Sequence, residues 1–183
     1  PAYINFIANF NDNRDGSFGI EYAASVTGKY RVSIQFDEKH ISGSPFEIDL
    51  SAGRGFPNKV TASERGVESP DIESPVRADE LTATFRLTSY DRFSNKIEEG
   101  GETFSVALVH PDDEAKYLPY KVVYDGFSSG TYTVTYNCTR AGKYSIGVMI
   151  DSFHISGSPF NPQIFPGATV TTASYDSGTG ITT

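Results

Sequence analysis

A seven-residue segment occurs twice in this chain and constrains its fold more than any other feature. The segment His40–Phe46 (HISGSPF) is repeated without change as His154–Phe160, at an offset of 114 residues. The same offset holds upstream without a gap, where it matches Gly28–Tyr30 with Gly142–Tyr144, Tyr22 with Tyr136, and Gly16 with Gly130. A long, fixed period of this kind indicates a tandem array of similar units.

The matching stretches alternate between apolar and polar residues, as strands with one buried face do. In Thr131–Tyr136 every second residue is a threonine, and the residues between are aromatic or aliphatic. The apolar sets with this two-residue period are Tyr132/Val134/Tyr136, Leu81/Ala83/Phe85/Leu87, Phe104/Val106/Leu108 and Tyr144/Ile146/Val148/Ile150, with Phe18/Ile20/Tyr22 and Tyr30/Val32/Ile34/Phe36 in the earlier copy. About seven short strands within roughly 100 residues are typical of an immunoglobulin-like sandwich. The predicted fold class is all-β, with tandem immunoglobulin-like β-sandwich repeats.

The register of the repeat predicts the domain boundaries. Residues 1–50 match only the second half of the unit, residues 51–167 contain a complete unit, and residues 168–183 echo the opening strand of a further one. Half a sandwich leaves the inner face of one sheet exposed, so we expect residues 1–50 to need strands from elsewhere. Phe46 and Phe160, which end the repeated segment, are expected to enter the cores.

Composition narrows the classes of partner. Asp and Glu outnumber Lys and Arg by 23 to 15, which gives a net charge of -8. An acidic surface repels phosphate backbones and anionic lipids, so we expect no nucleic-acid partner. No stretch approaches 18 consecutive apolar residues, so we expect no membrane insertion. Cys138 is the one cysteine, which rules out an internal disulfide and favours a reducing compartment. It aligns with Ala24, and we expect a buried, unreactive thiol.

No motif in the sequence indicates catalysis. The three histidines, His40, His110 and His154, do not belong to a Cys/His cluster, and we expect His40 and His154 to pack or to form hydrogen bonds. Asn11–Gly16 is superficially similar to a calcium loop, but Tyr22 stands where the bidentate Glu would be needed. We therefore predict a non-enzyme with no catalytic residues, no cofactor and no metal site.

The repeated segments resemble the filamin-type repeat. The Gly-Lys-Tyr strand at Gly142, followed by a short loop and His154–Phe160, is the hallmark of that family, and Gly130-Thr131-Tyr132 is similar to its turn-to-strand entry. Asp91–Asn95, followed by Gly100–Phe104, resembles the segment that joins its second and third strands. The resemblance covers nearly the whole chain. It departs from the family pattern at Ser129, where the turn usually carries Asp.

The third predicted strand of the complete unit suggests a binding site. Its outward residues include the small apolar Ala107 and Val109, which favours a covered or partner-seeking strand. In filamin-like repeats a partner segment adds as an extra strand beside this one, over the face of the third and fourth strands. The resemblance thereby implies the partner-binding residues Ser105, Ala107, Val109, Lys121 and Val123. The alternative is that a loop or a neighbouring repeat covers the strand.

The resemblance implies a non-catalytic rod segment of an actin-crosslinking, filamin-like scaffold, located in the cytoplasm on the cytoskeleton. Its partners would be neighbouring repeats and peptides bound by strand addition, and actin filaments would be bound by other parts of a longer chain. Two alternatives stay open. The first is an extracellular adhesion protein with filamin-like repeats, because Asn137-Cys138-Thr139 fits the N-glycosylation pattern. The chain could also be a structural component of a large filament such as an axoneme.

Overall fold

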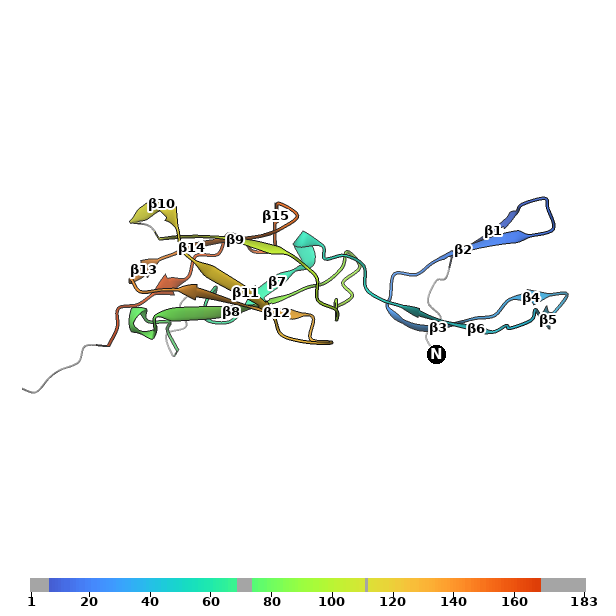
Figure 1. Ribbon diagram of the computed structural model, residues 1–183, viewed down its shortest axis with the longest axis horizontal. Helices are drawn as coiled ribbons and strands as arrows, with labels where there is room; N and C mark the ends of the chain where they lie inside the picture. Colours follow the sequence, from blue (N-terminus) through green and yellow to red (C-terminus); the bar gives the residue numbers. More distant parts are fainter. Residues whose placement is uncertain (1–6, 69–73, 111, 169–183) are drawn as a thin grey trace, which may run out of the picture.

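The computed structural model describes residues 7–68, 74–110 and 112–168, and their regular structure is almost entirely strand (Figure 1). We refer to residues 7–50 as the N-terminal hairpins and to residues 57–168 as the sandwich. The hairpins contain β1 (Ile7–Asp12), β2 (Phe18–Ala23), β3 (Gly28–Val32), β4 (Gln35–Phe36), β5 (Lys39–His40) and β6 (Phe46–Leu50). The sandwich contains the 3-10 turns η1 (Pro57–Lys59) and η2 (Ala78–Glu80) and the strands β7 (Thr61–Ser63), β8 (Thr82–Thr88), β9 (Phe104–His110), β10 (Asp113–Tyr117), β11 (Tyr120–Tyr124), β12 (Thr131–Asn137), β13 (Gly142–Lys143), β14 (Ser145–Ile150), β15 (Phe153–His154) and β16 (Gln163–Ile164).

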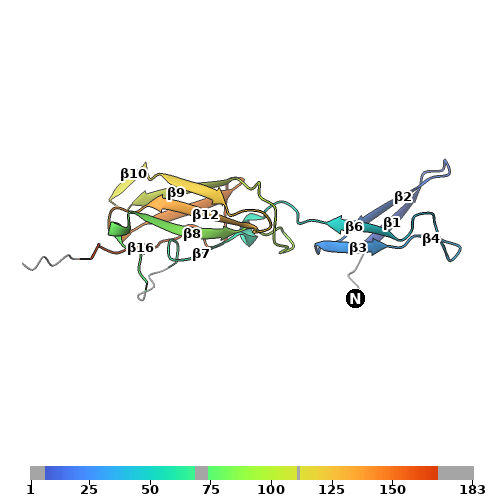
Figure 2. The same ribbon diagram turned by 60° about the horizontal axis from the view of Figure 1, so that its bottom comes forward.

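The two parts lie end to end in an elongated molecule, joined by residues 51–56 (Figures 1 and 2). The predicted further strand in residues 168–183 lies outside the described residues, apart from Ala168. No helix in the described part of the chain is long and apolar enough to span a membrane.

Two antiparallel sheets form the sandwich and face each other (Figure 2). Sheet I has the strand order β10-β9-β14-β15, and sheet II has the order β11-β12-β8-β7. Strands β13 and β16 form a further short ladder. Strands β9 and β11 are in contact with each other along one side of the sandwich. The predicted all-β sandwich is confirmed.

The core follows the alternation read from the sequence. Phe85, Leu87, Val134, Leu108 and Ile146 are completely or almost completely buried between the sheets, as predicted. Leu81 is an exception and a correction, because its side chain is 62% exposed. It caps η2 with a φ of 67°, so the strand alternation begins only after it, at Thr82.

The same residue types are far more exposed in the N-terminal hairpins. Tyr22 is 43% exposed, whereas Tyr136 at the corresponding position of the sandwich is 1% exposed. Phe160 is half-buried against the core, but Phe46 is exposed, which corrects the expectation that both would enter a core. Each of the hairpins β1–β2, β3–β6 and β4–β5 is a two-stranded sheet that pairs with no further strand among the described residues. Burial at these positions therefore depends on the complete set of strands and not on the residue type.

The repeated histidines have the structural role that the sequence indicated. His154 Nδ1 lies 2.7 Å from Ser158 Oγ, which also accepts a hydrogen bond from the N–H of Val148 (2.8 Å). His40 and Ser44 repeat this arrangement in the hairpins, with Nδ1 and Oγ 2.9 Å apart. Gly157, with a φ of +80°, lies between the two residues, where the chain turns through a conformation that favours glycine. The serine and histidine together hold the turn against the neighbouring strand.

Candidate protein-binding surface

Strand β9 has one edge that its sheet leaves largely unpaired. On one side it pairs with β14 from its first residue to Val109. On the other side β10 pairs only with Val109 and His110, and the N–H of Leu118 donates to the carbonyl of Leu108 (2.9 Å). No strand of the described chain is paired with this side of residues 104–107, which we call the free edge of β9. Such an edge can accept an additional strand.

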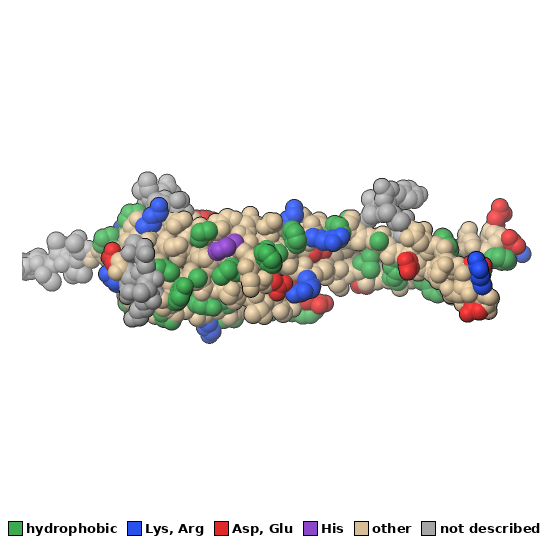
Figure 3. Space-filling view, turned by 90° about the horizontal axis from the view of Figure 1, so that it is seen from above, with side chains coloured by type: hydrophobic (Ala, Val, Ile, Leu, Met, Phe, Trp, Pro, Cys, Tyr) green, Lys and Arg blue, Asp and Glu red, His purple; other side chains and the backbone are tan. Residues whose placement is uncertain are grey.

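The outward face of β9 carries small side chains. Ser105 is exposed, and Ala107 and Val109 are half-buried, so all three lie on the face that the alternation predicted. Across the ladder, Ala107 is opposite Gly147 and Val109 is opposite Ser145. The side chains on this part of sheet I are short, and Gly147 itself is buried, with the His154 ring beside it. Figure 3 looks onto this side of the molecule and shows hydrophobic side chains distributed over it.

The structure does not bring Lys121 and Val123 onto this face. Both lie on β11, where Lys121 is opposite Thr135 and Val123 is opposite Thr133 of β12. These two side chains lie on the outer face of sheet II, whereas those of Ser105, Ala107 and Val109 lie on the outer face of sheet I. The five residues predicted for one site therefore divide between the outer faces of two sheets.

The contact between β9 and β11, which we call the seam, is lined by Val122 and Tyr124, two residues that the sequence analysis does not include in the site. Val122 and Tyr124 are partly buried against the core, and they occupy the opposite phase of β11 from Lys121 and Val123. The ring of Tyr124 lies 5.1 Å from that of Tyr132, and its hydroxyl donates to the carbonyl of Glu98 (2.6 Å). In the sequence YKVVY the phase Tyr120/Val122/Tyr124 is apolar throughout and the other phase holds Lys121, so alternation is the signal that could have found this inner face.

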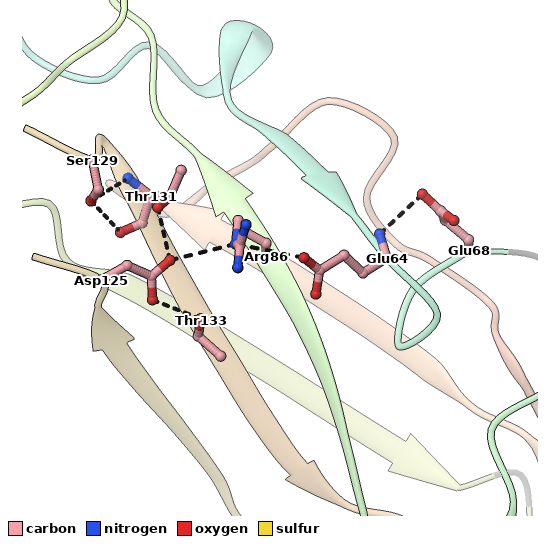
Figure 4. Close-up of polar contacts among 7 residues, drawn as sticks. All are labelled: Glu64, Glu68, Arg86, Asp125, Ser129, Thr131 and Thr133. Carbon is pink, nitrogen blue, oxygen red and sulfur yellow. Dashed lines mark hydrogen bonds and ion pairs between the residues drawn. The ribbon is translucent and has the colours of Figure 1, made fainter.

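The outer face of sheet II is occupied by polar contacts (Figure 4). Asp125 accepts hydrogen bonds from Thr131 Oγ1 (2.8 Å) and Thr133 Oγ1 (2.6 Å), and it lies 3.6 Å from Arg86 Nε. Burial alone would raise the pKa of Asp125, but the two hydroxyls and the guanidinium of Arg86 hold it below its ordinary value. Arg86 Nε is also 3.6 Å from Glu64. A partner on this face would have to displace these contacts.

A second concave surface lies at the joint between the hairpins and the sandwich. It is a groove of ≈ 840 Å³ whose apolar lining includes Val26, Phe56, Phe93 and Phe153, all of them exposed. The guanidinium of Arg92 lies 4.6 Å from the centre of the Phe93 ring. In Figure 3 basic and acidic side chains lie close together where the sandwich meets the linker.

Reactive groups in the described chain are held in structural contacts. His110 is buried, with Nε2 3.1 Å from the carbonyl oxygen of Ala141 and Nδ1 accepting from the N–H of Asp112 (3.1 Å). Cys138 is buried as expected, and burial raises the pKa of its thiol, which disfavours the reactive thiolate. Within the described residues there is no group of three or more His, Cys, Asp or Glu side chains that could hold a metal ion.

Comparison with known proteins identifies the repeat. The family model described as Filamin/ABP280 repeat matches residues 5–47 and 54–161. Filamin-C of Rattus norvegicus is 30% identical over 171 residues, which is 93% of this chain and 6% of that protein. The E3 ubiquitin-protein ligase TRIM45 of Mus musculus is 34% identical over 145 residues, covering 79% of this chain and 24% of the ligase. The chain therefore spans only a small part of these relatives.

Solved structures agree on the fold. The Lin-41 filamin domain has a TM-score of 0.50 at 13% identity and covers 62% of this chain and 98% of that domain. The Escherichia coli adhesin FdeC has a TM-score of 0.56 at 15% identity, covering 89% of this chain and 48% of the adhesin. At these identities the likeness concerns the fold alone. Together with the family match, it confirms the predicted resemblance to filamin-type repeats.

Proposed function

The chain belongs to the family of Filamin/ABP280 repeats, and on this basis we propose that it is a non-catalytic rod segment of a filamin-like cytoskeletal scaffold in the cytoplasm. Tandem sandwiches connected by short linkers act as spacers, because the length of the array follows the number of repeats. In this proposal the actin-binding region lies in other parts of a longer chain. The repeat itself contacts neighbouring repeats and binds partner peptides.

The free edge of β9 is the observation that carries the binding part of this proposal. An extended peptide that pairs with residues 104–107 gains main-chain hydrogen bonds, and its alternate side chains meet the neighbouring surfaces. On one side those surfaces are formed by Ser105, Ala107 and Val109, and on the other by the seam residues Val122 and Tyr124. Lys121 and Val123 belong to the binding site only if the bound peptide continues around β11 onto sheet II.

Charge substitutions on β9 test this site. Peptides are first selected by phage display against the parent chain, and their affinities are measured by fluorescence anisotropy. We expect Ala107→Glu and Val109→Glu each to weaken binding at least about 10-fold, which corresponds to about 1.4 kcal/mol. Because both side chains point outward, the melting temperature should change little. Thr82→Glu, an exposed position on sheet II, is the matched control, and Val123→Glu tests whether the peptide reaches that sheet.

If every selected peptide binds Ala107→Glu and Val109→Glu as tightly as the parent, the assignment of the site to β9 is wrong. A peptide that loses affinity only with Val123→Glu would place the site on sheet II instead.

Extracellular adhesion is a second candidate function, supported by Asn137. This residue is exposed at the end of β12, so the asparagine of the Asn137-Cys138-Thr139 pattern is accessible. Expression through a secretory pathway tests it: a glycan on Asn137 that a glycosidase removes would favour adhesion. Localisation of the native protein to the cytosol would exclude this function.

A further inference from the structure

The segment Asp91–Asn95, at the end of the sandwich nearest the hairpins, forms a closed turn around a buried carboxylate. Asp91 is 4% exposed, and its Oδ1 accepts from the N–H groups of Phe93 (2.8 Å) and Asn95 (2.9 Å). The N–H of Asp91 donates in return to the carbonyl of Asn95 (2.9 Å). The side chain of Asn95 donates from Nδ2 to Asp91 Oδ2 (2.9 Å). Contacts within the sandwich therefore fix the orientation of the Asn95 side chain.

Asn95 then spans the joint. Its Nδ2 donates to the carbonyl of Ser25 (2.8 Å), and its Oδ1 accepts from the N–H of Thr27 (3.2 Å). Ser25 and Thr27 belong to the turn between β2 and β3 of the hairpins. One amide side chain therefore forms hydrogen bonds with a carbonyl and an N–H that are two residues apart on the same turn.

Two carboxylates hold the linker beside this turn. Asp91 Oδ2 accepts from the N–H of Gly53 (3.1 Å), and Glu102 Oε1 accepts from the N–H of Gly55 (2.8 Å). A Cβ added at Gly55 would lie only 2.9 Å from the Glu102 carboxylate, so a larger residue at this position would require the Glu102 side chain to shift. Three side chains of the sandwich therefore make four hydrogen bonds to main-chain groups of the joint, beside a bond from the N–H of Phe56 to the carbonyl of Tyr90 (2.9 Å) and an exposed ion pair of Arg54 with Asp151 (2.9 Å).

We infer that Asp91, Asn95 and Glu102 form a docking surface for the preceding repeat, which recognises its turn and linker through main-chain groups alone. This inference deepens the proposed rod function and rests on it. Because the four bonded groups are backbone atoms, the surface does not depend on the side chains of the preceding turn. The partner it fits is any repeat of this type that presents a carbonyl and an N–H two residues apart in this turn. The contact fixes the angle between neighbouring repeats.

Distance measurements between spin labels test the inference in a chain that includes the whole preceding repeat, because residues 1–50 are expected to need strands from elsewhere. Labels are placed at Lys29→Cys and Ser63→Cys, which are exposed positions on either side of the joint, in a Cys138→Ala background. Alanine is suited to that position because Ala24 occupies it in the other copy. The parent is expected to give one narrow distance distribution. Asn95→Ala, which removes both bonds to the turn, is expected at least to double its width.

Two further variants separate the joint from general damage. Asn161→Ala, an exposed asparagine far from the groove, is the control and should leave the width unchanged. Thr27→Pro removes the N–H from the hairpin side and broadens the distribution without altering the sandwich, so it replaces Asn95→Ala if that variant does not fold. A parent distribution that is already broad, or an Asn95→Ala width equal to that of the parent, overturns the inference. The same outcome follows if Asn161→Ala broadens the distribution as much as Asn95→Ala.

Peptide affinity at the free edge of β9 is measured on the same variants. We expect Asn95→Ala to retain it. A failed docking surface and a failed peptide site therefore give different results.

Discussion

Tyr136 offers a sharp test of how the sandwich is held together. Its side chain is 1% exposed, and its hydroxyl donates to the carbonyl of Gly66 (2.8 Å), which lies in the buried turn after β7. Burial raises the pKa of Tyr136 well above its ordinary value, so the hydroxyl stays protonated and can donate. In Tyr136→Phe the ring remains and the Gly66 carbonyl loses its donor. A buried polar group without a partner costs about 1–3 kcal/mol.

This destabilisation is measurable by thermal and chemical unfolding of the full chain. For a domain of this size each kcal/mol lowers the melting temperature by about 4 °C. Tyr120→Phe is the control, because Tyr120 is 42% exposed on β11 and its change should stay within about 0.5 kcal/mol. If the two variants unfold at the same denaturant concentration, the hydrogen bond to Gly66 contributes nothing and the reasoning fails.

Two further predictions concern Asp91 and Leu81. Burial alone would raise the pKa of Asp91, but hydrogen bonds from Asn95, Gly53 and Phe93 hold it below its ordinary value of 3.8. Its contribution to stability is therefore fully present above that value and is lost as the pH falls through the lowered pKa. The difference in melting temperature between the parent and Asp91→Asn should shrink between neutral pH and about pH 2, and a constant difference would contradict this. Leu81→Ser should destabilise the sandwich by less than about 0.5 kcal/mol, as measured by urea unfolding. Leu87→Ser, at a fully buried position, should lower the free energy of unfolding several-fold more. Equal effects of the two variants would mean that Leu81 is buried in solution.

Periodicity predicted the fold because local pattern and tertiary burial agree over most of the sandwich. In β8, β9, β12 and β14 every second residue is buried, as the sequence indicated. Leu81 fits the same pattern, but the preceding 3-10 turn sets its backbone and directs it to solvent. Phe46 follows the same six residues as Phe160, yet it is exposed. A sequence pattern indicates which face of a strand a residue is on, and the other strands of the repeat decide whether that face is buried.

The candidate site was partly predictable for a related reason. Ala107 and Val109 were identified because small apolar residues in the polar phase of a strand are unusual. Lys121 and Val123 were placed beside them, although β11 belongs to the other sheet and directs them away from β9. Sheet membership follows from pairings between strands distant in sequence, which no local period contains. Asn95 has no periodic signal, because its role depends on main-chain atoms 68 and 70 residues away.

The joint and the free edge of β9 are connected through Glu102. Its carboxylate holds Gly55 of the linker, and its own N–H donates to the hydroxyl of Tyr132 (3.0 Å). The ring of Tyr132 in turn packs against Phe104, the first residue of β9, with the ring centres 5.0 Å apart. Two hydrogen bonds and one ring contact therefore connect Gly55 of the linker with the first residue of β9. In the proposed rod, the strand proposed to accept partner peptides therefore begins two residues after Glu102, which holds the preceding linker.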